Sequence, residues 1–361
     1  MKEASKIRLL VFTPTLQCGG SEKFVSLLCD HINTEKFSVC LAVLNNAVPF
    51  YQLKNPEVDL IDIKESRVRY SLFSIKKLVK EYQPDIIFST ANHLNLYFAI
   101  FRSWFPGQIK FIARESSIVS INSQRAAMPW LYDKLVKKYF RRFDLIICQS
   151  NYMQQDLLLH YNIKPAKTAI VHNATQTREL KELPTVDNSN KVYKFVTVAR
   201  LSEEKGIGRL IHSAGLLSVP FKFYIIGDGD KRESLQGLVN ELQLQDKVFF
   251  TGEKKDPFYG MEDADLFLMG SYYEGFPNVL LEAGSLGIPV IAFNAPGGIS
   301  EIIREEENGL LVDDNDILAF SGAVNRALSS GFNRDKIIES TKNRFSIDTM
   351  MKKLEDLLLQ L

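Results

Sequence analysis

Cysteine is scarce in this chain, and its few cysteines show no pairing pattern. The 361 residues include four of them, Cys18, Cys29, Cys40 and Cys148, with no C-x-x-C pair and no histidine at metal-ligand spacing. Disulfide frameworks are typical of short, cysteine-dense secreted chains, and structural zinc sites need closely spaced ligand pairs. We therefore expect neither, and a reducing cytoplasm is the natural compartment.

Long apolar runs are also missing. The polar stretch MKEASK is followed by the apolar run Ile7–Phe12, which is too short for the core of a signal peptide. No window of the sequence approaches the roughly 20 apolar residues of a membrane-spanning helix. Any membrane contact is therefore expected to be peripheral.

The whole chain lacks an excess of either charge, but each half has one. The sequence holds 44 basic and 43 acidic residues. Residues 1–185 carry 25 Lys or Arg against 16 Asp or Glu, a net of +9, whereas residues 186–361 carry 19 against 27, a net of −8. This split predicts two domains with different partners, and the basic half suits an anionic or phosphate-rich surface.

Apolar runs of strand length alternate with amphipathic helical stretches along the chain. Such alternation predicts an α/β fold with parallel sheets and crossover helices, and the length is ample for two doubly wound, Rossmann-like domains. The expected strands are Ile7–Thr13, Phe37–Leu44, Val58–Ile63, Asp85–Ser89, Lys110–Ala113, Leu145–Gln149 and Thr168–His172, then Lys194–Ala199, Phe221–Ile226, Val248–Phe250, Asp265–Met269, Pro289–Phe293 and Gly309–Val312.

A stretch without apolar periodicity, residues 173–190, is the predicted linker. It gives an N-terminal domain at residues 1–180 and a C-terminal domain at residues 190–343. The remaining residues, 344–361, repeat apolar side chains at helical spacing, which predicts an amphipathic helix.

The most informative stretch is 271–293, SYYEGFPNVLLEAGSLGIPVIAF. We expect one helix in it, because Pro277 tolerates a first-turn position and Asn278 can cap. In a strand, loop, helix, strand unit the ligand crevice lies at the carboxyl ends of the strands. Glu274 in the loop and Glu282 on the helix are therefore expected to point into one crevice, although either could be a solvated surface acid.

The string Glu274 to Val279, EGFPNV, with Glu282 resembles the E-x7-E signature of the retaining GT-B glycosyltransferases, specifically glycosyltransferase family 4. The resemblance implies a GT-B fold, two Rossmann-like domains with an interdomain cleft. It implies that Glu274 holds hydroxyls of the transferred sugar and that Glu282 holds the ribose. A carboxylate suits both tasks, because it accepts two hydrogen bonds. The donor-binding residues would also include Gly275, Phe276, Pro277, Asn278 and Val279.

The C-terminal helix is placed by the same resemblance. In GT-B folds such a helix crosses back to the first domain. The alternative is a helix that stays on the second domain.

Two cations form the expected diphosphate site. Arg200 ends a predicted strand and Lys205 precedes the next helix, a spacing that closely matches the family's R-x4-K pair. These charges would neutralise the leaving group in place of a metal; otherwise they are solvated surface cations. We expect no metal and no cofactor, since the D-x-D at Asp263–Asp265 leads straight into a buried strand.

Three further segments resemble donor-binding parts of the family. Gly19 and Gly20 precede a helix, where backbone N–H groups and the helix dipole attract an anion. Gly227 belongs to a glycine-rich turn that lacks the third glycine of a dinucleotide motif. Lys254 follows the next strand, where the family's backbone usually meets the base.

The N-terminal domain supplies the remaining candidates. His93 could donate to a sugar hydroxyl or a phosphate, although a lone histidine is often structural. Many family members place a histidine where this chain has Arg114 and Glu115. Arg114, with Asn92, therefore becomes the candidate acceptor contact.

A basic segment, residues 124–144, interleaves Lys and Arg with aromatic and aliphatic side chains. It is predicted to be a basic amphipathic helix, suited to anionic lipid. An ordinary crossover helix with solvated charges is the alternative. The net charge of the first half favours a membrane-borne acceptor.

The predicted enzyme is a retaining, metal-independent hexosyltransferase that moves a hexose or N-acetylhexosamine from a nucleotide diphosphate sugar, UDP-linked, to a saccharide hydroxyl. The acceptor would be a lipid-linked oligosaccharide or polysaccharide precursor, and the enzyme would be cytoplasmic and peripheral on the inner face of the membrane. No nucleic-acid partner is expected. The alternatives are a nucleotide-sugar epimerase of GT-B fold and a non-catalytic nucleotide-sugar-binding protein.

Overall fold

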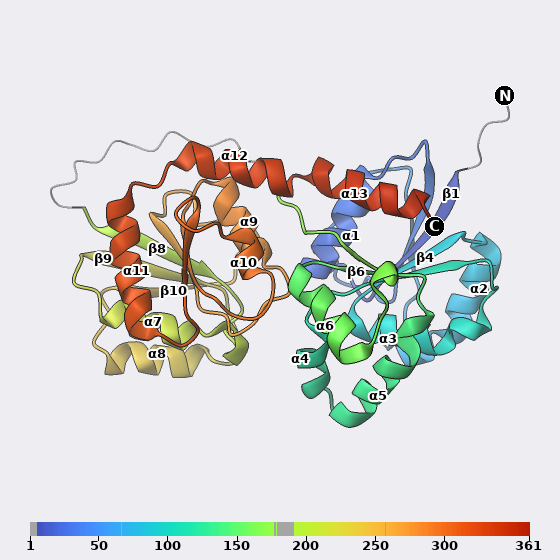
Figure 1. The fold of residues 1–361 in the computed structure, drawn as a ribbon, viewed down its shortest axis with the longest axis horizontal. Helices are drawn as coiled ribbons and strands as arrows, with labels where there is room; N and C mark the ends of the chain where they lie inside the picture. The colour runs from blue at the N-terminus through green and yellow to red at the C-terminus, as the bar shows by residue number, and fades with distance from the viewer. Residues whose placement is uncertain (1–5, 66, 177, 179–190, 257) are drawn as a thin grey trace. The chain divides into compact units, whose positions relative to one another are not determined.

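A computed structural model describes residues 6–65, 67–176, 178, 191–256 and 258–361. It divides the chain into two compact units (Figure 1). The first unit comprises the chain up to Asn173 together with Ile347–Leu361, and the second comprises Ala174–Ser346. Most of the predicted linker, residues 177 and 179–190, lies outside the described residues.

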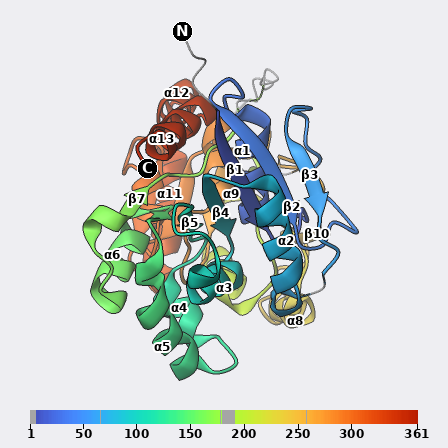
Figure 2. The same ribbon diagram turned by 90° about the vertical axis from the view of Figure 1, so that its right-hand side faces the viewer.

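The first unit is built on a parallel sheet. Among its described residues the strand order is β3-β2-β1-β4-β5-β6-β7. Of these strands, β3, β2, β1, β4, β5 and β7 are labelled from right to left in Figure 2. The strands are β1 (Ile7–Thr13), β2 (Phe37–Val43), β3 (Asp59–Asp62), β4 (Ile86–Thr90), β5 (Lys110–Arg114), β6 (Leu145–Cys148) and β7 (Thr168–Ile170).

Crossover helices connect these strands. They are α1 (Gly20–His31), α2 (Leu72–Tyr82), α3 (Asn92–Phe101), α4 (Val119–Gln124), α5 (Pro129–Tyr139) and α6 (Asn151–Tyr161), with the short 3₁₀ turns η1 (Val68–Tyr70), η2 (Arg102–Trp104), η3 (Phe140–Arg142) and η4 (Pro165–Lys167). The last helix of the chain, α13 (Ile347–Leu359), also belongs to this unit and packs against α1.

The second unit repeats the architecture. Its described strands form a parallel sheet in the order β10-β9-β8-β11-β12-β13. These strands are β8 (Tyr193–Val198), β9 (Phe221–Ile226), β10 (Val248–Gly252), β11 (Leu266–Met269), β12 (Val290–Phe293) and β13 (Gly309–Val312). The helices are α7 (Ile207–Gly215), α8 (Arg232–Glu241), α9 (Asn278–Ser285), α10 (Ile299–Ile302), α11 (Ile317–Ser330) and α12 (Arg334–Phe345), with the 3₁₀ turn η6 (Glu203–Lys205).

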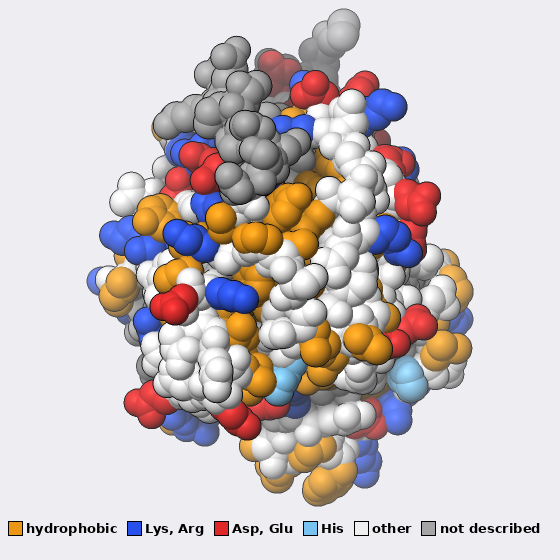
Figure 3. All heavy atoms as spheres, turned by 90° about the vertical axis from the view of Figure 1, so that its left-hand side faces the viewer, with side chains coloured by type: hydrophobic (Ala, Val, Ile, Leu, Met, Phe, Trp, Pro, Cys, Tyr) orange, Lys and Arg blue, Asp and Glu red, His pale blue; other side chains and the backbone are white. Residues whose placement is uncertain are grey.

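One face of the molecule mixes charge types. On the face shown in Figure 3, basic and acidic side chains lie interspersed around apolar groups. The excess of acidic residues in the second half of the sequence is therefore not gathered into one acidic patch on this face.

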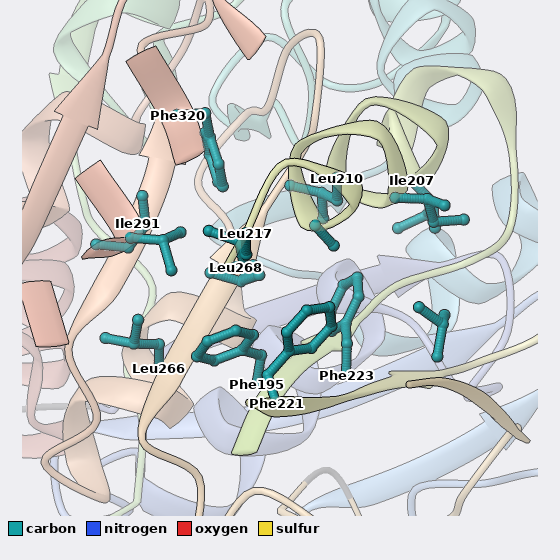
Figure 4. Close-up of a cluster of buried hydrophobic side chains, with 14 of the residues drawn as sticks. Phe195, Ile207, Leu210, Leu217, Phe221, Phe223, Leu266, Leu268, Ile291 and Phe320 are labelled. Carbon is teal, nitrogen blue, oxygen red and sulfur yellow. The ribbon is translucent and has the colours of Figure 1, made fainter. Parts of the chain in front are cut away.

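Strands covered by helices on both faces explain why most residues of the predicted runs were apolar. Phe195, Phe223 and Leu268 are at most 1 % exposed and pack with Leu210 of α7 and Phe320 of α11 in one cluster (Figure 4). A fully buried parallel strand needs such continuous apolar runs. All 13 expected strands are found among the described residues, most of them shifted by one or two positions at an end.

The single helix expected over residues 124–144 is wrong. α4 ends at Gln124, α5 begins at Pro129 and ends at Tyr139, and η3 follows. Proline has no N–H to continue a preceding helix but fits the first turn of a new one, so Pro129 starts α5 rather than lying inside a longer helix.

Each sheet reverses its strand order at one place. In the first unit the reversal lies between β1 and β4, and in the second it lies between β8 and β11. Ligands of doubly wound sheets bind at the carboxyl ends of the strands beside such a switch point. The segments that follow these four strands hold most of the candidate site residues, whereas Gly227, Lys254 and Arg114 lie at the ends of β9, β10 and β5.

Candidate functional site

The centre of the second unit's switch point is an ion pair. Lys205 Nζ, which follows β8, lies 2.7 Å from Glu274 Oε1, which follows β11. Ser271 Oγ donates to the same carboxylate oxygen at 2.7 Å. The Lys205 and Glu274 side chains are 22 % and 13 % exposed, so water competes weakly for either charge. The two residues that the sequence singled out separately are therefore in direct contact.

Glu274 is also fixed through its backbone. Its N–H donates to the Pro296 carbonyl at 2.9 Å, and it forms an isolated bridge with Gly297 in the loop after β12. Gly297 has a φ of 123°, and a Cβ there would overlap the Glu274 carbonyl oxygen. Only glycine allows the two loops to lie this close.

Arg200 lies at the carboxyl end of β8, and its side chain is exposed. The neighbouring loop backbone is tied to the turn after β9, because the Leu201 N–H donates to the Asp228 carbonyl and the Lys231 N–H donates to the Leu201 carbonyl, both at 2.9 Å. Gly227 begins that turn. Arg200 is therefore a cation on a braced loop, available to an anion.

Glu282 lies in the middle of α9 and is only 4 % exposed. The helix begins at Asn278, and Pro277 stands at the capping position, where its side chain makes no capping hydrogen bond. The expectation that Asn278 caps α9 is therefore wrong. The reason is that the fixed φ of Pro277 already sets the turn into the helix.

The residues between the two acids divide into buried and accessible side chains. Phe276 is buried and packs its ring 5.6 Å from that of Phe345, so its side chain belongs to the core. Pro277 is buried too, whereas Gly275, Asn278 and Val279 are half-buried. Only the backbone of Phe276 is left to meet a ligand. Lys254, after β10, lies with its ammonium 4.8 Å from the Tyr259 ring centre.

In the first unit, Gly19 and Gly20 lie at the start of α1, as expected. The Glu22 carboxylate folds back over Gly19 and accepts a hydrogen bond from Thr15 Oγ1 at 3.3 Å. Negative charge is favourable at a helix N-terminus. The Glu22 carboxylate therefore lies at the end of α1 where negative charge is favoured.

Asn92 and His93 open α3, directly after β4. Asn92 Nδ2 donates to Ser117 Oγ at 2.9 Å. Ala91, which precedes them, has a φ of 75°, a conformation that costs free energy for a residue with a Cβ. The protein around His93 desolvates part of its imidazole and lowers its pKa, so the exposed part of the side chain is a neutral ring with one donor and one acceptor at pH 7.

Arg114 is not available to an acceptor in this structure. It is fully buried at the end of β5, with its guanidinium carbon 3.8 Å from the Phe24 ring centre and Nη2 bonded to Asn173 Oδ1. Burial lowers the Arg114 pKa to about 9 and raises the Glu115 pKa to about 7. The predicted acceptor contact is thus an internal brace between β5, α1 and the end of the unit.

Sequence reasoning missed two groups. Asn95 Nδ2 donates to Glu115 Oε1 at 2.8 Å inside the first unit, and Arg209 is buried beside the loop of Glu274 in the second. Both are polar residues on amphipathic helices, and a single charged or amide side chain in such a pattern is predicted to face solvent. No signal in a single sequence separates a buried arginine from an exposed one.

Neither a metal site nor a membrane span is found in the part of the chain that the structure describes. Across those residues, no group of three or more His, Cys, Asp or Glu side chains is arranged to hold a metal ion. Nor does the described part of the chain include a helix long and apolar enough to cross a bilayer.

Two family models match the sequence. Residues 18–179 match the model described as Glycosyltransferase Family 4, and residues 181–344 match the model described as Glycosyl transferases group 1. Together the matches span both units.

Individual relatives agree with these matches. The N-acetylgalactosamine-N,N'-diacetylbacillosaminyl-diphospho-undecaprenol 4-alpha-N-acetylgalactosaminyltransferase of Campylobacter jejuni is 26 % identical over 348 residues, 93 % of each chain. An uncharacterised glycosyltransferase of Methanocaldococcus jannaschii is 30 % identical over 306 residues, 79 % of this chain and 74 % of that protein. Among solved structures, Anabaena HepE in complex with UDP-glucose superposes with a TM-score of 0.80 at 17 % identity, covering 98 % of this chain and 100 % of HepE.

Proposed function

Because the chain belongs to glycosyltransferase family 4, with a GT-B fold, and is a glycosyltransferase, we propose that it moves a hexose or N-acetylhexosamine from a UDP-sugar to a saccharide hydroxyl with retention at the anomeric carbon. The acceptor in this proposal is a lipid-linked oligosaccharide or polysaccharide precursor. The observation that carries the proposal is the Lys205–Glu274 pair, a cation and a carboxylate held together at the switch point of the second unit.

The pair offers the two kinds of contact that a nucleotide diphosphate sugar needs. Lys205 can exchange its carboxylate partner for a phosphate oxygen, and exposed Arg200 on the same loop can bind the diphosphate through its planar fork. The freed Glu274 carboxylate then accepts hydrogen bonds from sugar hydroxyls. Glu282 is assigned to the ribose. The backbone of Gly275–Val279, with Gly227, Lys254, Gly19 and Gly20, is assigned to the rest of the donor.

The proposed transfer breaks the bond between the anomeric carbon and the terminal phosphate oxygen and forms one to the acceptor oxygen. The acceptor hydroxyl attacks from the face that the diphosphate leaves, and its proton passes to the departing phosphate oxygen. Arg200 and Lys205 stabilise the charge that develops on the leaving group. His93, neutral near pH 7, is assigned to a hydroxyl or phosphate of the substrates, and Asn92 to the acceptor.

Support for the donor and acceptor classes comes from the relatives. HepE was solved with UDP-glucose, and the Campylobacter jejuni relative is named for a diphospho-undecaprenol acceptor. The two cations, Arg200 and Lys205, can neutralise the diphosphate, so we propose that transfer needs no metal. Activity that survives chelation by EDTA supports this part, whereas activity lost with EDTA and restored by Mg²⁺ or Mn²⁺ contradicts it.

Contact with an anionic membrane is proposed for the first unit. On α5, Trp130 is 68 % exposed beside exposed Lys134 and Lys138. Around α3, which packs against η1, η2 and α5, Tyr70 and Trp104 are also more than half exposed. Exposed aromatic rings among cations suit the interface of an anionic bilayer.

This contact would make the protein cytoplasmic and peripheral on the inner membrane face. Co-flotation with phosphatidylglycerol vesicles, but not with phosphatidylcholine vesicles, tests it. Substituting Trp130 and Lys134 together should abolish flotation, and equal flotation of this variant would contradict the proposal.

Acceptor-dependent release of UDP tests the function as a whole. The wild-type protein is incubated with a panel of UDP-sugars, with and without undecaprenyl-diphosphate-linked saccharides, and UDP and sugar products are separated by chromatography. Release that requires an acceptor supports the transferase. Conversion of the sugar without an acceptor would identify an epimerase, and binding without release would identify a sensor.

A further inference from the structure

Arg209 is a buried cation that the proposed reaction does not yet use. It lies on α7 and is 5 % exposed. Its guanidinium donates from Nε to the Gly270 carbonyl at 2.6 Å, from Nη2 to the Ser271 carbonyl, and from Nη1 to Asp314 Oδ1 at 2.6 Å. Burying a charge costs free energy unless hydrogen bonds and an opposite charge compensate it. Here every guanidinium nitrogen has such a partner.

Aromatic rings hold the same guanidinium from its sides. Its central carbon lies 4.1 Å from the ring centre of Tyr272 and 3.9 Å from that of Phe293. Tyr272 follows β11, Phe293 ends β12, and Asp314 follows β13. Arg209 therefore joins the carboxyl ends of three neighbouring strands to the start of α7.

The bonds of Arg209 lead to the ion pair in two directions. Ser271, whose carbonyl Arg209 holds, donates its Oγ to Glu274 Oε1 at 2.7 Å. On the other side, the guanidinium lies against Gly206, next to Lys205, since a Cβ built on Gly206 would lie 3.0 Å from Arg209 Nε, and the backbone N–H of Arg209 donates to the Gly206 carbonyl at 3.2 Å. Arg209 thus touches the segment that carries each member of the Lys205–Glu274 pair without touching either charged group.

We propose that Arg209 is a positioning residue that sets the loop 271–274 against Lys205 and so orients the Glu274 carboxylate toward the sugar of the donor. This role rests on the proposed function of Glu274. Lysine cannot replace it, because an ammonium is a single point of charge, whereas the three bonds of Arg209 diverge from one rigid plane.

Binding measurements test the role separately from transfer. Calorimetry with UDP and with UDP-glucose, UDP-N-acetylglucosamine and UDP-N-acetylgalactosamine gives the affinities of the wild type and of Arg209→Lys. We expect the variant to bind the preferred UDP-sugar at least about fivefold more weakly, and UDP within about twofold of the wild type. A general loss of structure would lower the affinities for UDP and for the UDP-sugar together.

Arg334→Lys is the matched control. Arg334 also braces backbone in the second unit, donating from Nε to the Leu286 carbonyl at 2.8 Å and from Nη2 to the Glu262 carbonyl at 3.4 Å, but it makes no contact with the loop 271–274 in the described structure. Its replacement should lower the melting temperature without changing the ratio of UDP-sugar to UDP affinity.

A double-mutant cycle with Ser271→Ala then asks whether Arg209 acts through Ser271. If it does, the affinity of the double variant for the UDP-sugar is at most about twofold lower than that of the single variant with the lower affinity. If the two residues act independently, the fold-losses of affinity of the two single variants multiply in the double variant. Should Arg209→Lys fail to fold, Asp314→Ala replaces it, because loss of the carboxylate that holds Nη1 frees the guanidinium to shift away from the Gly270 and Ser271 carbonyls. A smaller but still sugar-selective loss is expected.

The outcomes separate the two levels of the proposal. Unchanged UDP-sugar affinity in folded Arg209→Lys, with a wild type that binds, overturns the role of Arg209 alone. A wild type that binds none of the UDP-sugars overturns the donor assignment and the Arg209 role with it.

Discussion

At the scale of single residues, the proposed function makes the Lys205–Glu274 pair a donor site that is arranged before its ligand arrives. The two side chains meet at 2.7 Å and are largely shielded from water. Pairing compensates two charges that would otherwise be partly desolvated and unmatched. In the proposed function a diphosphate compensates the charge of Lys205 and sugar hydroxyls donate hydrogen bonds to Glu274, so each group gains a new partner when the pair opens.

Replacing Glu274 by alanine should abolish transfer while leaving nucleotide affinity largely intact. The carboxylate is assigned to sugar hydroxyls alone, and Lys205 without its partner remains free for phosphate. We expect kcat/KM to fall by about 100-fold or more and the UDP affinity to change by less than about threefold. Acceptor-dependent UDP release and calorimetry with UDP measure the two quantities.

Arg200→Ala is the comparison for this prediction. Because Arg200 is assigned to the diphosphate, its loss should weaken UDP binding and transfer together. Normal transfer by the Glu274 variant, or intact UDP binding by the Arg200 variant, would defeat the corresponding assignment.

Glu115 should make the stability of the first unit depend on pH. Burial raises its pKa from 4.5 to about 7 in the folded state, so folding favours the protonated form. Its contribution to stability is therefore fully present below about pH 4.5 and is lost as the pH rises through about 7. Glu115→Gln cannot ionise and should gain stability relative to the wild type between pH 5 and 8, by up to about 3 kcal/mol.

Urea unfolding at pH 5, 6, 7 and 8 measures this difference. Glu81→Gln is the control, since Glu81 is exposed on α2 in the same unit and should show no such trend. A constant difference between Glu115→Gln and the wild type at all four pH values would contradict the prediction.

At the scale of elements, the strands were predictable and the helix boundaries were less so. Ile7–Thr13 and Phe221–Ile226 were predicted to the residue, because a strand covered on both faces is marked by a run of mostly apolar residues, interrupted here only by Arg8 and by Lys222 before the strand ends. The basic segment 124–144 was wrongly predicted to be one helix, because basic and apolar residues interleave on both sides of Pro129. A preceding helix cannot continue through this proline, which has no backbone N–H to donate.

The candidate site was predictable where motif and fold coincide. Lys205 and Glu274 follow adjacent strands at a switch point, so their meeting follows from the strand order. Arg114 was misassigned and Arg209 overlooked for one reason. Whether an arginine is buried depends on which rings and carbonyls surround it, and Phe24 and Phe293 are distant in the sequence.

Loop packing at the strand ends gives a prediction of its own. A Cβ at Gly297 would overlap the Glu274 carbonyl oxygen, and the φ of 123° is itself unfavourable for alanine. Gly297→Ala should therefore displace the Glu274 backbone and lower kcat/KM by at least about tenfold, as measured by acceptor-dependent UDP release.

Gly322→Ala provides the matched control. Gly322 lies inside α11, and the position that an alanine methyl group would take there is open space. Alanine is also the better helix former by about 1 kcal/mol. This variant should keep full activity and be equally or more stable. Equal activity of both variants would show that the packing of loop 297 on loop 274 does not matter for transfer.

At the scale of the whole molecule, the two ends of the chain belong to one unit. The chain leaves the first unit after Asn173 and returns to it at Ile347. The segments next to these two points are hydrogen-bonded to each other, since the Thr175 N–H donates to the Phe345 carbonyl at 3.0 Å. α13 then packs on α1, and the Asn33 N–H donates to Glu355 Oε1 at 2.9 Å. The first unit therefore completes its core only after the second has been synthesised.

A substitution in α13 should accordingly destabilise the unit that begins the chain. Leu354 is fully buried and Leu359 is 45 % exposed on the same helix. Leu354→Ala should lower the free energy of unfolding by about 2 to 4 kcal/mol through lost burial and the cavity left behind, whereas Leu359→Ala should change it by no more than about 0.5 kcal/mol.

Because the two units can unfold separately, a single melting temperature does not show which unit has lost stability. Hydrogen exchange of the amides of β1 and of β8 reports each unit by itself. Faster exchange in β1 with unchanged exchange in β8 is expected for Leu354→Ala, and the reverse pattern would mean that α13 supports the second unit instead.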